Sequence, residues 1–291
     1  MRLKEVPCDI CGSEDVSAIN VCRVTRKDAD MEECVLTLVR CRACGLVFVN
    51  PRPVFSKEEI ERLYSKEYFD APYMKFYGAQ KREAIQSNED FTYRLSMIEK
   101  FKTGSRMLDV GCASGEFLKM AKQRGWEVRG VDLSEYAAGM ARSEHGIDVF
   151  KGTLEGARFS DGEFDAVICG DVLEHVRSPR AFLKEVERIL KPGGIVYIAT
   201  PDFGSFHYRL MSFVAKLTYK NYFVLPHHLY HFTGSTLKRL LEISGFKIEK
   251  AVRSQSRYTD KGLKAFLASV IFLIGQILNM PDRIIMIARK A

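Results

Sequence analysis

The chain has 291 residues, of which 46% are hydrophobic and 28% are charged, and its net charge is +7. This length is sufficient for an α/β core and one small additional module. The composition is that of an ordinary soluble protein, which excludes low-complexity and repeat architectures. The N-terminus lacks the apolar core of a signal peptide, so we expect a cytoplasmic protein whose eight cysteines bind metal or remain free thiols.

The basic charge is concentrated in the C-terminal third. Residues 201–291 hold 14 Lys/Arg and 5 Asp/Glu, whereas residues 1–200 hold 30 and 32. This excess predicts attraction to an anionic ligand or an anionic membrane surface, or a solvated basic face without a partner.

Two Cys-x-x-Cys-Gly motifs stand near the N-terminus, and 29 residues lie between Cys11 of the first and Cys41 of the second. Each motif places two thiols on one tight turn, and its glycine allows backbone amides to point toward sulfur. Four thiolates form the tetrahedral set that suits zinc and leave no position for a catalytic water. We therefore predict a zinc-ribbon-like module over residues 1–55. Its structural Zn²⁺ ligands are Cys8, Cys11, Cys41 and Cys44.

A helical lead-in is expected over residues 56–103. Ser56 and Glu59 form a capping-box pattern before its first helix. We expect this segment to cover the next domain, and as an alternative Tyr77 and Arg94 help to close a ligand pocket.

Strand-like and helix-like runs alternate over residues 104–291. The predicted strands are 106–110, 127–132, 147–150, 164–169, 195–200 and 283–289. The predicted helices are 116–124, 134–144 and 179–190, the last ended by Lys191, Pro192, Gly193 and Gly194, and one that begins near Thr233. This alternation indicates a parallel, doubly wound, Rossmann-like α/β sheet that binds ligands beyond the carboxyl ends of its strands.

A glycine-rich turn, Gly111 to Gly115, follows the first of these strands. It lacks the Lys–Ser/Thr pair of a P-loop and the full dinucleotide fingerprint, which disfavours a triphosphatase and an NAD-dependent oxidoreductase. The second strand ends at Asp132, 23 residues after Asp109, where a carboxylate can accept hydrogen bonds from both hydroxyls of a ribose. The sequence therefore predicts a nucleoside ligand without a pyrophosphate.

Four segments, in chain order, resemble the motifs of class I S-adenosylmethionine-dependent methyltransferases. They are LDVGCASGEFL, GVDLSEYAAGMAR, FDAVICGDVLEHV and LKPGGIVYIATPD. The sequence departs from the family at Ala113, where glycine is more usual. The cysteine module and PHHLYHFTGSTLKRLLEISGF further resemble a subgroup with an N-terminal zinc-binding segment that acts on sugars and other small metabolites.

The resemblance implies a cofactor role for each matching residue. Asp109 would organise the glycine turn, Asp132 would bind the ribose and Leu133 would pack on adenine. Glu155 would contact the adenine amino group, although Thr153 stands where an acid is common. The implied cofactor-binding residues are Asp109, Gly111, Cys112, Ala113, Gly115, Asp132, Leu133, Glu155 and Asp171, with Arg94 and Tyr77 from the lead-in.

Methyl transfer to oxygen or carbon requires in-line approach to the methyl carbon and removal of the acceptor's proton. The segment with His227, His228 and His231 is the best source of a base, because the imidazole pKa lies near neutrality. The resemblance places Asp171 and His175 beside the sulfonium and the substrate. We predict His228, His231 and His175 as catalytic. Alternatively, the histidines cap helices, or His228 and His231 bind a divalent ion, although no acid nearby in the sequence completes such a set.

Two apolar segments, 203–225 and 263–280, lie within the basic third. The second has one charge in 18 residues and falls short of the roughly 20 residues that span a bilayer. We expect it to pack in the core or in a homodimer, or to lie on an anionic membrane surface.

The sequence thus predicts S-adenosylmethionine-dependent O- or C-methylation of a small metabolite, a sugar or glycan precursor, or a lipid-linked acceptor. A lipid-linked acceptor would place the protein at the inner face of the membrane. The alternative is a zinc-module RNA-binding protein or an RNA methyltransferase, which is disfavoured because the cysteine segment has a balanced charge.

Overall fold

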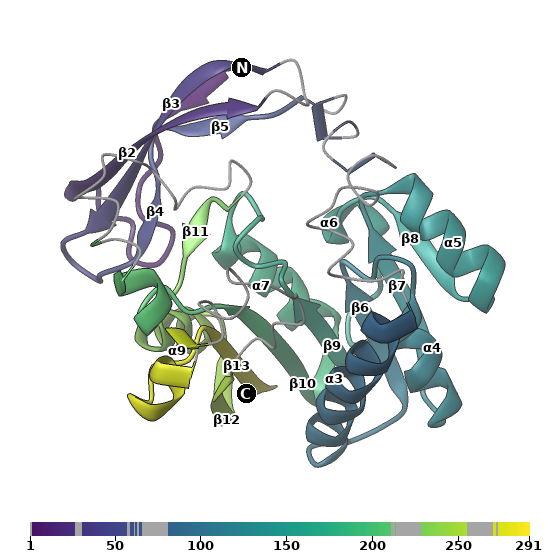
Figure 1. Cartoon of the computed structure of the whole chain (residues 1–291). Helices are drawn as coiled ribbons and strands as arrows, with labels where there is room; N and C mark the ends of the chain where they lie inside the picture. Colours follow the sequence, from purple (N-terminus) through teal and green to yellow (C-terminus); the bar gives the residue numbers. More distant parts are fainter. Residues whose placement is uncertain are drawn as a thin grey trace.

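A seven-stranded sheet forms the centre of the α/β part in the computed structural model (Figure 1). The structure describes residues 2–26, 31–56, 59, 60, 62, 64, 65, 81–210, 213, 228–254, 270, 271 and 273–291. The spatial order of the strands is β12 (Phe246–Ser254), β13 (Arg283–Lys290), β10 (Leu190–Pro201), β9 (Phe164–Gly170), β6 (Arg106–Val110), β7 (Glu127–Asp132) and β8 (Asp148–Lys151). Only β13 is antiparallel to its neighbours in this sheet. The doubly wound, Rossmann-like sheet is confirmed, but β13 makes it mixed rather than entirely parallel.

Helices cover both faces of this sheet, because successive strand residues point to opposite sides. Met107 and Ile168 belong to the core under one group of helices, and their neighbours Leu108 and Val167 belong to the core under the other. The first group is α3 (Lys81–Glu99), α4 (Glu116–Gln123) and α5 (Glu135–His145); the second is α6 (Leu154–Ala157), α7 (Pro179–Ile189) and α9 (Gly234–Ile243).

Hydroxyl side chains begin four of these helices, among them α5, α7 and α9. Ser134, Ser178 and Thr233 each accept a hydrogen bond from the amide three residues later, which stabilises the first turn of α5, α7 and α9. The Lys191–Gly194 run, expected to follow α7 as a loop, instead lies within β10. It forms a bulge between Leu190 and Ile195, so the strand starts five residues before its predicted position.

The N-terminal residues form a second, four-stranded sheet that includes a strand from the α/β part. Its order is β11 (Tyr230–His231), β4 (Val47–Val49), β3 (Met31–Cys41) and β2 (Val16–Arg26), and β1 (Arg2–Lys4) pairs separately with β5 (Arg52–Val54). Figure 1 shows β1 to β5 in purple and blue above the large sheet, and β11 in green. Leu46 and Phe48 share a hydrophobic core with Leu108 and Val196 of the large sheet. The predicted boundaries at residues 55 and 103 stay predictions.

The lead-in begins as the sequence indicates. The Ser56 amide donates to the Glu59 carboxylate over 2.6 Å, and the Glu59 amide donates to the Ser56 hydroxyl over 3.2 Å, which confirms the capping box. Tyr77, His227, most of the segment 203–225, and residues 263–269 and 272 of the segment 263–280 lie outside the described residues. Among the helices that the structure describes, none is both long and apolar enough to cross a bilayer.

Candidate functional site

The glycine turn after β6 contains three residues in the left-handed region of backbone space. Gly111 has φ 75°, Ala113 has φ 47° and Gly115 has φ 80°. A Cβ on Gly111 would lie 2.7 Å from Val172, and one on Gly115 would lie 2.8 Å from Ala141. Both glycines are therefore required by conformation and by space. Ala113 adopts the same conformation with a side chain, which costs about 1–2 kcal/mol.

Asp132, at the end of β7, holds this turn in place. Its two carboxylate oxygens accept hydrogen bonds of 2.8 Å from the amides of Ala113 and Ser134. Each oxygen keeps a second lone pair, so a ribose hydroxyl can still donate to it.

Cys112 differs from its neighbours in the turn. A Cβ on Gly130 would lie 2.6 Å from the Cys112 sulfur, so this thiol lies in the core and only its backbone borders the turn.

Asp109 is a buried acid at the carboxyl end of β6. Burial raises its pKa to about 7; the nearby Arg94 guanidinium lowers the pKa and the Asp132 charge raises it. The guanidinium carbon of Arg94 lies 5.0 Å from the ring centre of Phe117 and 5.4 Å from that of Tyr197. The structure therefore holds one cation and two acids together beside the glycine turn.

Arg94 also reaches the adjacent strand. A Cβ on Gly170, the last residue of β9, would lie 3.1 Å from a guanidinium nitrogen of Arg94. A helix of the lead-in thus supplies a positive charge at the carboxyl ends of the central strands, where an anionic group of a ligand can bind.

The residues predicted to contact adenine follow β7 and β8. Leu133 is half-buried, and Glu155 is exposed on α6. The Thr153 hydroxyl caps α6 by accepting a 3.2 Å hydrogen bond from the Gly156 amide. The contacts of Leu133 and Glu155 with adenine stay predictions.

Asp171 follows β9 and forms an ion pair that sequence reasoning missed. One guanidinium nitrogen of Arg283, the first residue of β13, lies 2.7 Å and 2.8 Å from the two Asp171 carboxylate oxygens. Asp171 has φ 55°, which is uncommon for a residue with a side chain. The ion pair joins the loop after β9 to the strand inserted beside β10.

Glu174 lies three residues further along this loop and is 1% exposed. Its Oε2 accepts a 3.0 Å hydrogen bond from the Thr200 hydroxyl, whereas Oε1 has no hydrogen-bond partner within the described part of the chain. Burial, reinforced by the Asp171 charge, raises the pKa of Glu174 to about 8. Sequence reasoning did not select this acid.

Main-chain hydrogen bonds bring the histidine segment against Glu174. The Glu174 carbonyl accepts from the amides of Leu229 and Tyr230, at 2.8 Å and 3.2 Å. The ring of His228 consequently lies 4.6 Å from the ring of His175, centre to centre, with an interplanar angle of 80°. Two of the predicted catalytic histidines are therefore adjacent.

His231, the third predicted catalytic histidine, lies on β11. It is 5% exposed, and burial lowers its pKa to about 4, so the imidazole is neutral. Its Nε2 is buried without a hydrogen-bond partner among the residues described, and its ring centre lies 6.4 Å from that of His228. The capping alternatives are not supported, because Ser178 caps α7 and Thr233 caps α9.

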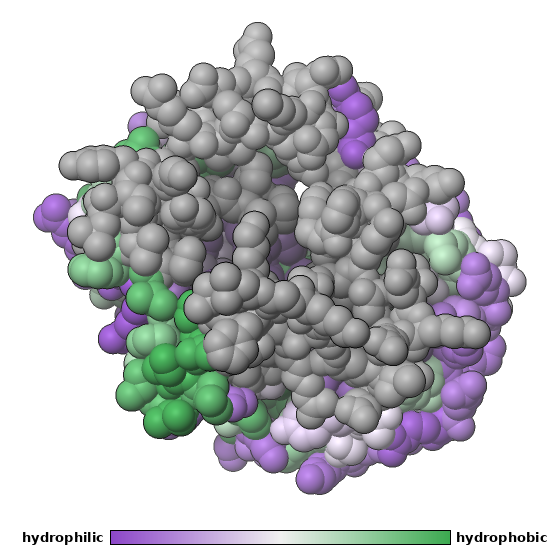
Figure 2. Space-filling view, viewed as in Figure 1, coloured by the Kyte–Doolittle hydropathy of each residue, from purple (hydrophilic) through white to green (hydrophobic). Residues whose placement is uncertain are grey.

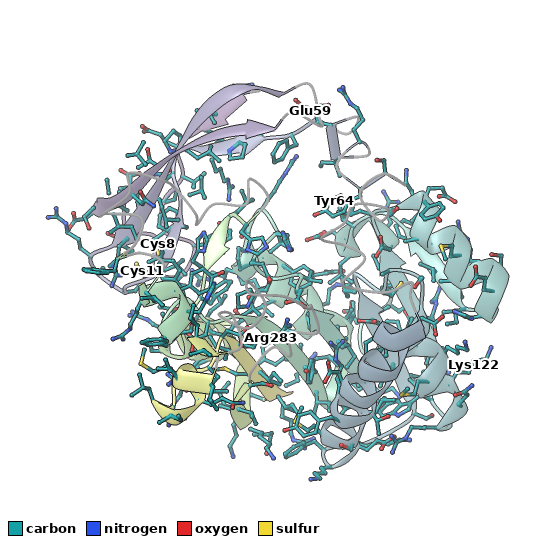
Figure 3. All side chains as sticks on the ribbon, viewed as in Figure 1. Cys8, Cys11, Glu59, Tyr64, Lys122 and Arg283 are labelled. Atoms are coloured by element: carbon teal, nitrogen blue, oxygen red, sulfur yellow. The ribbon has the colours of Figure 1, made fainter. Side chains whose placement is uncertain are left out.

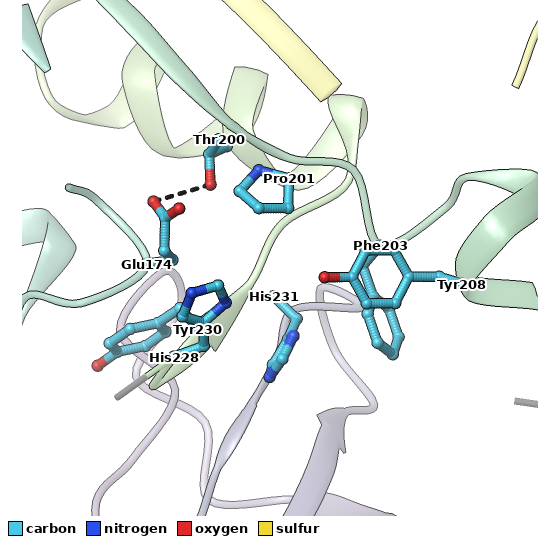
Figure 4. A pocket seen from close by; sticks show the side chains of 8 residues that line it. All are labelled: Glu174, Thr200, Pro201, Phe203, Tyr208, His228, Tyr230 and His231. Atoms are coloured by element: carbon cyan, nitrogen blue, oxygen red, sulfur yellow. Dashed lines mark hydrogen bonds between the residues drawn. The ribbon is translucent and has the colours of Figure 1, made fainter. Parts of the chain in front are cut away.

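These groups line a narrow pocket beyond the carboxyl ends of β9 and β10. Figure 4 shows the Glu174 and His228 side chains on one side of the pocket and Phe203 and Tyr208 on the other. The lining residues are Glu174, Thr200, Pro201, Phe203, Tyr208, His228, Tyr230 and His231. The lining combines aromatic walls with a few polar groups, as small-molecule sites do, and the lining side chains leave little empty space between them.

The four motif cysteines converge as predicted. The sulfur atoms of Cys8 and Cys44 lie 3.4 Å apart, those of Cys11 and Cys41 lie 3.5 Å apart, and all four lie within 4.8 Å of one another. A tetrahedral zinc site with bonds of 2.3 Å places its sulfurs about 3.8 Å apart. The cluster is therefore compatible with zinc.

The two turns of the cluster have the same backbone geometry. The Gly12 amide donates to the Cys8 carbonyl over 2.8 Å, and the Gly45 amide donates to the Cys41 carbonyl over 2.9 Å. Figure 3 shows Cys8 and Cys11 side by side at the base of the N-terminal strands. Such paired turns are typical of a structural metal site.

The cysteine turns are tied to the pocket-forming segments. The carboxylate of Asp9 accepts hydrogen bonds from the Ser178 hydroxyl, at 2.8 Å, and from the Arg180 amide, at 2.7 Å. The Arg52 guanidinium donates to the Tyr230 hydroxyl over 3.0 Å. The N-terminal part thus contacts both the start of α7 and the β11 segment.

Comparison with known proteins agrees with this geometry. Residues 79–251, more than half of the chain, match the family model described as "Methyltransferase domain". The chain belongs to the S-adenosylmethionine-dependent methyltransferases. The family resemblance inferred from the four motifs is thereby confirmed.

Relatives of this methyltransferase include proteins named ubiquinone biosynthesis O-methyltransferase. The one from Dechloromonas aromatica is 40% identical over 103 residues, which are 33% of this chain and 44% of the relative. The one from Burkholderia thailandensis is 30% identical over 157 residues, which are 49% of this chain and 68% of the relative. The first of these matches thus spans less than half the length of the relative.

Solved structures show the same fold. A magnesium protoporphyrin IX methyltransferase from Synechocystis, solved with bound SAH, has a TM-score of 0.59 and 16% identity, and the match covers 81% of this methyltransferase and all of that chain. An S-adenosylmethionine-dependent methyltransferase from Archaeoglobus fulgidus has a TM-score of 0.52 and 25% identity. This match covers 77% of this methyltransferase and all of that chain. The class I methyltransferase fold is therefore established.

Proposed function

We propose that this methyltransferase transfers the methyl group of S-adenosylmethionine to an oxygen or carbon atom of a small-molecule or lipid-linked acceptor that binds in the pocket of Figure 4. The main support is the position of Glu174, His175 and His228. They lie beyond the carboxyl ends of β9 and β10, next to the strands that carry the glycine turn. Ligands of doubly wound sheets bind at this edge.

The residues beside the glycine turn fit the cofactor. When bound, S-adenosylmethionine supplies a methyl carbon that its sulfonium charge already activates. Arg94 offers a cation for the carboxylate of the methionine portion, and Asp109 offers an acid for its ammonium group. Asp132, which holds the turn through the Ala113 and Ser134 amides, would accept hydrogen bonds from the ribose. Arg94 and Asp109 thus match the carboxylate and the ammonium group of this ligand, and Asp132 matches its ribose hydroxyls.

The histidines supply the remaining chemistry, which is removal of the acceptor's proton. His228 lines the pocket and His175 lies against the His228 ring. Both are half-buried, so an acceptor can approach them, whereas His231 is buried and neutral. The name O-methyltransferase, which the relatives carry, supports a hydroxyl acceptor. A ring hydroxyl or a sugar hydroxyl satisfies this requirement.

An exposed apolar surface supports a lipid-linked acceptor. Figure 2 shows hydrophobic side chains gathered at the lower left, over the 270–280 segment that is yellow in Figure 1. Leu273, Ile277 and Leu278 are each more than half exposed there. These side chains lie in the C-terminal third, which holds 14 Lys/Arg and 5 Asp/Glu. Apolar burial together with positive charge favours binding at an anionic lipid interface. We propose that this surface docks the methyltransferase on a membrane that holds its acceptor.

Isotope labelling tests the proposed function. A deletion strain and its parent are supplied with methyl-labelled methionine, and the small-molecule, lipid and RNA fractions are compared. We expect one labelled small or lipid-linked product to disappear, to return with the wild-type gene or with His145→Ala, and to stay absent with His228→Ala. Loss of label from RNA alone would contradict the proposal and favour an RNA methyltransferase.

A further inference from the structure

The Glu174 carboxylate presents a buried oxygen that the described protein groups do not satisfy. Thr200 donates to Oε2, but Oε1 has no hydrogen-bond partner among the described residues, and the side chain is 1% exposed. A buried carboxylate oxygen without a donor is costly, because its interaction with water is lost and nothing replaces it. Such an oxygen therefore indicates a ligand that supplies positive charge or a donor.

Two imidazoles lie beside this carboxylate. One ligand atom from each of Glu174, His175 and His228 can be chosen so that all three lie within 4.8 Å of one another. They come from the loop after β9 and from the segment before β11, and the hydrogen bonds from the Leu229 and Tyr230 amides to the Glu174 carbonyl hold these two segments together. These backbone hydrogen bonds thus hold the Glu174, His175 and His228 side chains close enough to bind one ion.

We propose that Glu174, His175 and His228 bind a divalent cation at the edge of the acceptor pocket. The sequence suggested His228 and His231 as the metal-binding pair without an acid; the structure instead joins His228 to His175 and supplies Glu174. Two imidazole nitrogens and one carboxylate suit first-row ions such as Mn²⁺, Co²⁺ or Zn²⁺ better than Mg²⁺ or Ca²⁺. Three protein ligands leave positions for the acceptor oxygen.

The use of this cation rests on the proposed methyl transfer to a hydroxyl, whereas its binding does not. A hydroxyl oxygen bound to the cation loses its proton to water more readily, because the cation stabilises the oxyanion. That oxygen then forms the bond to the methyl carbon, and the sulfur–carbon bond breaks with its electron pair remaining on sulfur. The oxyanion and the sulfonium become a neutral ether and a neutral thioether, so no oxidant or reductant is needed.

Binding of Mn²⁺ to the purified protein tests the site, because Mn²⁺ prefers nitrogen and oxygen ligands and does not compete for the four thiolates. The free ion is measured by electron paramagnetic resonance during titration. We expect one Mn²⁺ site per chain, displaced by Zn²⁺ or Co²⁺. Glu174→Gln and His228→Gln should each weaken Mn²⁺ binding by about tenfold or more.

His145→Gln is the matched control. His145 also pairs with a glutamate, because its Nε2 lies 2.9 Å from a Glu116 carboxylate oxygen, but this pair lies on α4 and α5. The His145→Gln variant should retain wild-type Mn²⁺ affinity. Calorimetry with S-adenosylhomocysteine verifies that each variant is folded. Absence of a Mn²⁺ site in the wild-type protein, or equal Mn²⁺ affinity in wild type and in folded Glu174→Gln, would overturn the proposal.

The same experiments separate this site from the proposed function. If methyl transfer continues at full rate in the presence of a chelator and the protein binds no Mn²⁺, the cation site is refuted. The histidines would then remove the acceptor's proton without a metal. If the protein binds Mn²⁺ tightly but methylates no small or lipid-linked acceptor, the cation site is supported and the proposed function is refuted.

Discussion

Asp9, between the two cysteines of the first motif, accepts a hydrogen bond from the hydroxyl of Ser178, 169 residues later in the chain. Ser178 begins α7, and the turn that precedes this helix carries Glu174 and His175. A residue inside the cysteine cluster therefore anchors the loop on which the acceptor pocket depends, although the cluster itself is not part of the pocket.

Replacing Asp9 should affect turnover more than cofactor affinity. Asp9→Ala removes two acceptors at the start of α7, and loss of a helix cap typically costs about 1 kcal/mol. We expect lower kcat with an unchanged S-adenosylhomocysteine dissociation constant. Asp15→Ala is the control, because Asp15 is exposed and its pair with Arg42 contributes about 0–1 kcal/mol. Equal kcat in both variants would show that Asp9 does not position the loop.

The cysteine cluster should hold one zinc ion per chain. Cys11→Ser removes one of four converging sulfurs, so the zinc content measured by mass spectrometry should fall and thermal stability should decrease, because metal binding is coupled to folding. Cys112→Ala, whose thiol lies in the core of the α/β part, should keep its zinc. A metal-free wild-type protein that remains folded would refute the zinc site.

Asp109 should make stability depend on pH. Its pKa is raised from the ordinary value of 3.8 to about 7, chiefly by burial, so the folded state retains a proton that the unfolded state releases. The stabilisation is present in full below about pH 4 and is lost as the pH rises through 7. Arg94, Asp132, Cys112 and Cys169 face this carboxyl group.

The measurement is the free energy of unfolding in urea from pH 4 to pH 8. Asp109→Asn cannot release a proton from this side chain. Its free energy of unfolding should therefore fall less than that of the wild type as the pH rises from 4 to 8. Asp148→Asn, an exposed acid on β8, should follow the wild-type curve. Identical curves for wild type and Asp109→Asn would mean that Asp109 ionises normally.

Ala113→Gly should stabilise the protein. Glycine removes the cost of the left-handed conformation at φ 47° and adds some flexibility to the unfolded chain, so we expect a net gain of up to about 1 kcal/mol. The same substitution at Ala138, within α5, should destabilise by about 1 kcal/mol. Urea unfolding measures both. A loss of stability in Ala113→Gly would show that the methyl group packs favourably enough to offset the strain.

The apolar surface over residues 270–280 should bind anionic vesicles. We expect flotation with vesicles that contain phosphatidylglycerol, weaker binding at high salt, and loss of binding when Leu273 and Ile277 are both replaced by Asp. Val21→Asp, an exposed position on β2, is the control. A wild-type protein that stays in solution at low salt, or a Leu273/Ile277 variant that only dissociates a homodimer, would assign this surface to packing.

The strands of the large sheet could be predicted where their signal is local. β6, β7 and β9 are short apolar runs bounded by glycine or acidic residues, and their observed bounds agree within one residue with those predicted. β12 was missed because its buried and exposed residues alternate, so that Lys247, Glu249 and Lys250 dilute the apolar signal. β11 has two residues and exists only through its pairing with β4.

The residues of the candidate site likewise divide into those with a local sequence signal and those that only the folded chain brings together. The glycine turn, Asp132 and the converging cysteines were found because each belongs to a short motif whose spacing specifies its geometry. Glu174 could not be recognised as the acid beside His228, because main-chain hydrogen bonds between distant segments bring them together. Arg283 reaches Asp171 only because β13 inserts beside β10, which no local pattern encodes.

The pairing of β4 with β11 has a consequence for protein synthesis. Phe48 pairs with Tyr230, so about 180 further residues must be translated before β4 gains this neighbour. At 5–20 residues per second, the nascent chain carries an open strand edge for about 10–40 s. Open edges pair readily with other chains, so ribosome-bound or truncated forms that end before residue 230 should depend on chaperones, whereas the full-length chain covers the edge with its own backbone.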